Sequence, residues 1–70
     1  MKEIKAMMAG TVLMIPVSKG ERISAGQEVI ILESMKMAIP IESSEAGVVE
    51  EVLVGVGDFV NDGDILVVLK

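Results

Sequence analysis

The feature that most limits how this chain can fold is an internal repeat that aligns without a gap. Residues 9–33, AGTVLMIPVSKGERISAGQEVIILE, match residues 46–70, AGVVEEVLVGVGDFVNDGDILVVLK. The identical pairs include Gly10/Gly47, Gly20/Gly57 and Gly26/Gly63. A glycine that recurs at a matched position indicates a shared backbone requirement, and two copies are too few for a solenoid. The repeat predicts a single domain, residues 1–70, with two similar halves related by an approximate twofold axis.

Each half has the sequence character of β-strands. The runs TVLMIPV and VVEEVLV are rich in β-branched residues, and EVIILE and DILVVLK are short apolar runs between turn residues. The segments SAGQ and NDGD predict turns, as do SKGE and GVGD. Pro16 and Pro40 have no N–H to donate and are expected at strand edges or bulges. No stretch combines helical periodicity with caps, so the predicted fold class is all-β.

Size and charge exclude several classes of function. A chain of 70 residues with 1 aromatic residue must build an efficient aliphatic core from Val, Ile, Leu and Met. The net charge of −5 argues against nucleic-acid binding, which needs a basic surface. No apolar run approaches the length of a membrane span, and the N-terminal residues do not resemble a signal peptide. The absence of cysteine fits a reducing compartment, and a cytoplasmic location is expected.

Neither catalysis nor metal binding is predicted. The chain has no His, Cys or Tyr, so the usual pairs of nucleophile and base are absent. The acidic segment DFVNDGD, residues 58–64, could suggest calcium, but its spacing is not that of an EF-hand loop. The matched segment ERISAGQ keeps the glycine and lacks most of the acids. A solvated turn is therefore the preferred interpretation of residues 58–64, and the chain is not expected to act as an enzyme alone.

The most informative residues lie in the link between the repeats, residues 34–45, SMKMAIPIESSE. A strand is expected to enter this link and another to leave it, so the chain must reverse at residues 34–37 as a hairpin. Lys36 falls at that reversal between Met35 and Met37. One interpretation is a surface lysine beside two core-filling methionines. The other is a contact site, because methionine adapts to partner surfaces and an exposed lysine amine can form an amide with an activated acid.

The segment ESMKM, residues 33–37, resembles the attachment signature of biotinyl domains, and the two repeats resemble the biotinyl/lipoyl attachment family over nearly the whole chain. The resemblance implies a flattened β-barrel or sandwich of two small, mostly antiparallel sheets with the modified lysine on an exposed hairpin. It makes Lys36 the biotin attachment residue and Met35 and Met37 its flanking motif. The partners that it implies are a biotin–protein ligase, a biotin carboxylase and a carboxyltransferase or decarboxylase, between which biotin carries a carboxyl group.

Some positions depart from the pattern of this family, and two other functions stay open. Ser34 stands where biotinyl domains often have alanine, and Ala38 where they often have an acid. Lipoyl members usually have Asp-Lys-Ala in place of Met35–Met37, yet a lipoyl carrier for a 2-oxoacid dehydrogenase complex, with lipoate on Lys36, is an alternative. The other alternative is an unmodified β module whose hairpin is only a binding contact, although retention of a lysine at the turn argues against it.

Overall fold

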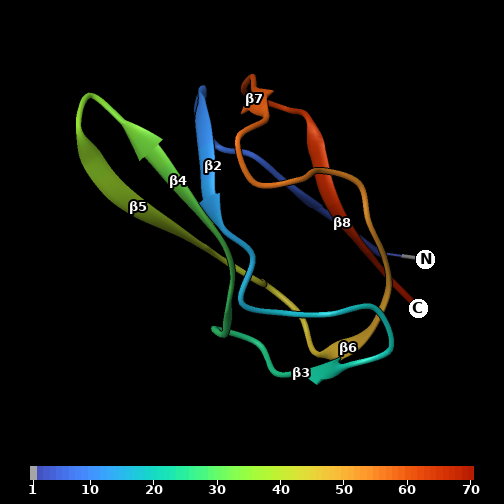
Figure 1. Cartoon of the computed structure of the whole chain (residues 1–70). Coiled ribbons are helices and arrows are strands. Elements are labelled where there is room, and N and C mark those ends of the chain that lie inside the picture. Colours follow the sequence, from blue (N-terminus) through green and yellow to red (C-terminus); the bar gives the residue numbers. More distant parts are fainter. Residues whose placement is uncertain (1) are drawn as a thin grey trace.

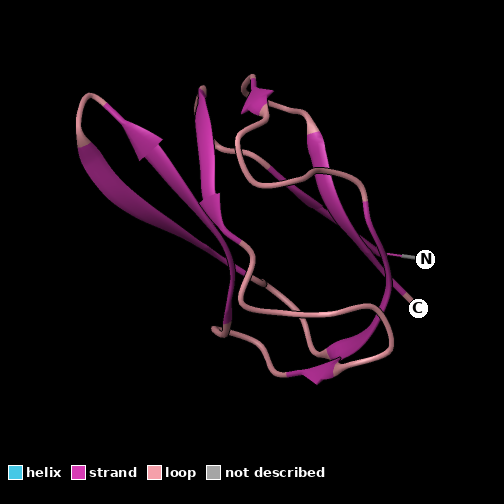
Figure 2. Cartoon of the chain, viewed as in Figure 1, coloured by secondary structure: helices cyan, strands magenta, loops and turns pink. Residues whose placement is uncertain are grey.

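The computed structural model describes residues 2–70, which form eight β-strands joined by turns and short loops (Figures 1 and 2). The strands are β1 (Lys2–Lys5), β2 (Gly10–Met14), β3 (Arg22–Ile23), β4 (Glu28–Ser34), β5 (Met37–Glu42), β6 (Gly47–Val52), β7 (Phe59–Val60) and β8 (Ile65–Leu69). The sequence predicts strands in the regions of β2, β4, β5, β6 and β8, which are rich in apolar and β-branched residues. It does not predict β1, which is mostly charged, or β3 and β7, which have 2 residues each.

The strands form two separate antiparallel sheets of 4 strands each. One sheet has the order β5-β4-β2-β7 and is called here the hairpin sheet, and the other has the order β1-β8-β6-β3 and is called the opposite sheet. The predicted all-β class with two small antiparallel sheets is confirmed, and because the sheets stay separate the fold is a sandwich and not a closed barrel. The part of the chain described contains no helix long and apolar enough to cross a membrane.

Each sheet contains strands from both halves of the chain. The hairpin sheet takes β2 and β4 from the first repeat, β7 from the second and β5 from the link between them, and the opposite sheet takes the four strands at the matched positions. The offset that places residue 9 on residue 46 also converts one strand order into the other. We call it the repeat offset. Neither half therefore forms a sheet by itself, and the halves exchange strands across the approximate twofold axis.

The hydrogen bonds between the halves obey the same offset. The Gly57 N–H donates to the Val12 carbonyl, and the Gly20 N–H donates to the Val49 carbonyl, each at 2.8 Å. A second pair of bonds is related by the same offset. The Gly26 N–H donates to the Ser43 carbonyl at 2.7 Å, and the Gly63 N–H donates to the Ala6 carbonyl at 2.9 Å. The matched bonds extend the structural equivalence beyond residues 9–33 and 46–70 to Ala6 and Ser43, which directly follow β1 and β5.

The core lies between the two sheets and is built from aliphatic side chains. Its buried members are Ile4, Ala6, Val12, Val17, Ile23, Val29, Ile30, Leu32, Ile41, Val49, Val60, Leu66, Val67 and Leu69. The expectation that methionine contributes to the core holds only for Met8, which is partly buried and packs against it, while Met7, Met14, Met35 and Met37 are exposed. These four methionines are thus available for contacts outside the fold.

Gly26 and Gly63 occupy the matched turns with φ values of 88° and 92°. A β-branched residue is strained in this left-handed region even where its side chain has room, as it has here. We expect Gly26→Val and Gly63→Val each to lower the free energy of unfolding by more than about 1 kcal/mol, measured by urea denaturation. Gly55→Val is the control, because Gly55 has no positive φ, and it should cost less than about 0.5 kcal/mol. Equal losses in all three variants would contradict the backbone explanation.

Candidate functional site

The hairpin of β4 and β5 positions the candidate site. The two strands pair from Ile30 and Ile41 to Ser34 and Met37, and the chain reverses in the two residues between them, Met35 and Lys36. Alternation along the strands sends the buried Leu32 and Ile41 into the core, which fixes the base of the hairpin. Figure 1 shows the turn at an outer corner of the molecule, away from both chain ends.

Both turn residues have a left-handed backbone, with φ of 53° at Met35 and 64° at Lys36. Two-residue hairpin turns with positive φ at both positions favour Asn-Gly, because other residues are strained there. Met35 and Lys36 are the only non-glycine residues with positive φ in the described chain. Backbone strain of this kind persists at functional sites, where the identity of the side chains matters more than the stability of the turn.

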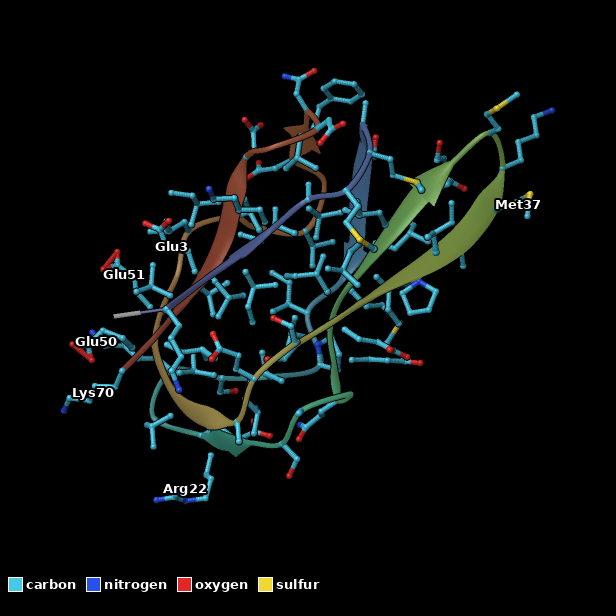
Figure 3. The ribbon with its side chains drawn as sticks, turned by 180° about the vertical axis from the view of Figure 1, so that it is seen from behind. Glu3, Arg22, Met37, Glu50, Glu51 and Lys70 are labelled. Carbon is cyan, nitrogen blue, oxygen red and sulfur yellow. The ribbon has the colours of Figure 1, made fainter. Side chains whose placement is uncertain are left out.

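The side chains of the candidate site are open to solvent. Met35 is 92% exposed and Met37 is 64% exposed, and Lys36 is also exposed. Within residues 2–70 no carboxylate lies within ion-pair distance of the Lys36 amine, since the ion pair found there joins Lys2 to Glu45. The interpretation of both methionines as core fillers is therefore wrong. The turn presents one primary amine between two accessible thioethers, of which that of Met37 is labelled in Figure 3.

The comparisons with known proteins identify the family. Residues 2–69 match the model of a family described as "Biotin-requiring enzyme", whose name is Biotin_lipoyl. The chain belongs to the biotin/lipoyl attachment family. This confirms the resemblance seen in the sequence, and with it the class of carrier domain as opposed to an enzyme.

The proteins similar to this chain include small proteins that match it over nearly their whole length and a much larger enzyme that contains a similar domain. The chain is 50% identical to the Biotin/lipoyl attachment protein of Bacillus subtilis (strain 168), over 96% of this chain and 92% of that protein. It is 40% identical to the Biotinylated protein TB7.3 homolog of Mycobacterium leprae (strain TN), over 99% and 97%. The crystal structure of the Kluyveromyces lactis urea carboxylase contains a similar domain, with a TM-score of 0.92 and 28% identity, covering 99% of this chain and 6% of that one.

The acidic segment of this biotin/lipoyl attachment domain has a structural task. Asp58 accepts a hydrogen bond from the Gly55 N–H, and Asp64 accepts one from the Asn61 N–H, each at 2.8 Å. These bonds cap two turns, which agrees with the predicted interpretation of residues 58–64. Among residues 2–70 no three acidic, His or Cys side chains lie close enough together to hold a metal ion.

Proposed function

We propose that Lys36 is the biotin attachment residue of this carrier and that Met35 and Met37 form its recognition motif. The observation that carries the proposal is the exposed amine on a strained two-residue turn within a family of biotin-requiring proteins. No pocket is found among the described residues. A covalent bond at Lys36 is the mode of attachment that suits this surface.

The chain contributes presentation, and its partners contribute chemistry. Lys36 Nζ must lose a proton before it can form a bond to the carboxyl carbon of an activated acid, while the bond from that carbon to the leaving group breaks. The other side chains of the turn, those of Met35 and Met37, offer no base for this proton. The proton must therefore pass to solvent or to a group of the enzyme that activates the acid. Once attached, biotin carries a carboxyl group between two enzymes.

The partners proposed for this carrier are a biotin–protein ligase, a biotin carboxylase and a carboxyltransferase or decarboxylase. The support is that relatives bear names such as Pyruvate carboxylase of Staphylococcus aureus, of which this chain covers 6%. Such a carrier would work where carboxylases work, and a cytoplasmic location stays a prediction from the cysteine-free sequence. Lipoate on Lys36 and an unmodified hairpin are the competing outcomes.

Labelling with a biotin–protein ligase, ATP and biotin tests the proposal. We expect intact mass to show a single biotinyl group and peptide mass to place it on Lys36, while Lys36→Arg takes up none. Lys19→Arg is the control, because Lys19 also lies in an exposed turn, and it should be labelled like the unchanged chain. Biotin on another lysine would refute the assignment, and incubation with a lipoate ligase and lipoate would reveal the lipoyl alternative.

A further inference from the structure

The two sheets differ sharply on their outer faces although the repeat offset relates them. On the hairpin sheet several outward side chains are apolar. They are Leu13, Met14, Ile31, Pro40 and Phe59, and we call them the apolar face. Met14 is 56% exposed and Phe59 is 65% exposed. Exposed apolar side chains are ordinary when scattered singly and informative when they gather on one surface.

The strand register places these side chains next to one another. Met14 lies opposite Ile31, and Ile31 lies opposite Pro40 on the edge strand β5. A bulge at Leu13 turns this residue toward the same side as Met14. Phe59, beside Thr11, continues the surface to the other edge of the sheet. The apolar face therefore spans all four strands, including both strands that lead into the Lys36 turn.

The opposite sheet acts as an internal reference for what the fold itself requires. Under the repeat offset the row Met14–Ile31–Pro40 corresponds to the row Glu51–Val68–Glu3, which has the same pairing. Leu13 corresponds to Glu50, and Phe59 corresponds to Arg22. Figure 3 shows Glu3, Glu50 and Glu51 on the side of the molecule remote from Met37. The same backbone positions tolerate charged residues, so folding does not demand the apolar side chains of the hairpin sheet.

The charged side chains on the four strands of the apolar face are all negative. Glu28 and Glu42 are paired at one end of the face, and Glu33 lies between Thr11 and Ala38 at the other. All three glutamates are exposed, and strands β2, β4, β5 and β7 contain no lysine or arginine. A second copy of this chain would bring the glutamates of two molecules together, which is unfavourable. A protein surface with an apolar centre and a basic rim is complementary to the face.

We propose that the apolar face docks the biotin–protein ligase through an apolar, basic-rimmed surface of that enzyme. This inference rests on the proposed function of Lys36, because the face is continuous with the strands that carry the turn. Docking on the sheet would hold the hairpin in place while the amine reacts, and would let the enzyme recognise more than the three residues Met35–Met37. The face thereby adds a second recognition element to the carrier.

The test exchanges the residues of one sheet for those at the matched positions of the other. The variant Met14→Glu/Phe59→Arg introduces the residue types of Glu51 and Arg22 and leaves the net charge unchanged. In initial-rate assays with a biotin–protein ligase, we expect the KM for this variant to rise about tenfold while kcat changes less than about twofold. The control Glu51→Gln/Arg22→Gln, which also preserves net charge, should keep the KM of the unchanged chain.

Two further measurements separate docking from other effects. Urea denaturation, together with direct acylation of Lys36 by an activated biotin ester, should give the same results for the variant and the unchanged chain if only docking is lost. An unchanged KM overturns the docking inference and leaves the attachment proposal standing. No labelling of the unchanged chain overturns both. If the unchanged chain is a dimer that the variant Met14→Glu/Phe59→Arg dissociates, and KM stays the same, then a second copy of the chain occupies the face. That result would also overturn the inference.

Discussion

Gly10→Ala should lower the free energy of unfolding by about 2 kcal/mol, although the same substitution at the matched Gly47 should change it by less than about 1 kcal/mol. A Cβ added at Gly10 would lie 2.8 Å from the Glu33 carbonyl oxygen, which is backbone within a paired strand and has little room to move. At Gly47 the nearest atom is the Leu69 Cβ at 3.5 Å, an ordinary van der Waals contact.

Urea denaturation of both variants measures this difference, and Gly47→Ala serves as the matched control because it removes the same conformational freedom from the unfolded chain. The strand β4, which contains Glu33, leads directly to the turn, so Gly10→Ala should also slow labelling at Lys36. Equal stability of the two variants would show that β4 can shift away from β2 without loss, and that the hairpin is held less firmly than its pairing indicates.

Replacing the turn Met35–Lys36 with Asn-Gly should stabilise the domain by about 1 kcal/mol and abolish biotinylation. The physical reason is that asparagine and glycine adopt a positive φ with less strain than methionine and lysine. A gain in stability together with a complete loss of labelling is expected only if the native residues serve a purpose other than folding. Thermal or urea denaturation and intact mass measure the two effects.

Met35→Asn alone is the control for this substitution, since it relieves strain at one position and keeps the amine. It should be more stable than the unchanged chain and should still accept biotin during a long incubation. A loss of stability in the Asn-Gly variant would mean that Met35 or Lys36 contributes contacts to the fold. Labelling of that variant would place the attachment residue elsewhere.

The repeat made much of this fold predictable from the sequence. The matched glycines and the β-branched runs indicated turns and strands that the structure contains, and they placed Lys36 at a reversal of the chain. Pro40, expected at an edge, lies in the edge strand β5. These predictions succeeded because local residue preferences and the alternation of apolar residues act over short segments.

Three features were not accessible in that way. The exchange of strands between the halves depends on contacts between distant segments, which a repeat alone does not specify. The left-handed turn contains Met and Lys, whereas Asn-Gly is the sequence pattern that predicts such a turn. The apolar face required knowledge of which side chains point outward, although the substitutions Met14/Glu51 and Phe59/Arg22 between the halves were visible in the aligned repeats. A comparison of outward positions between the halves would have found it.

The pairing of the chain ends has a consequence for how the domain could be held. Lys2 lies opposite Leu69, and the repeat offset relates this pair to Ile39 and Leu32, just below the turn. The ends therefore occupy, on the opposite sheet, the place that the turn occupies on the hairpin sheet (Figure 1). A polypeptide tether joined to either end of the chain would therefore be attached to the domain far from Lys36. The length of the domain would then add to the distance that Lys36 can reach from the far end of the tether. The tether itself would stay away from the amine.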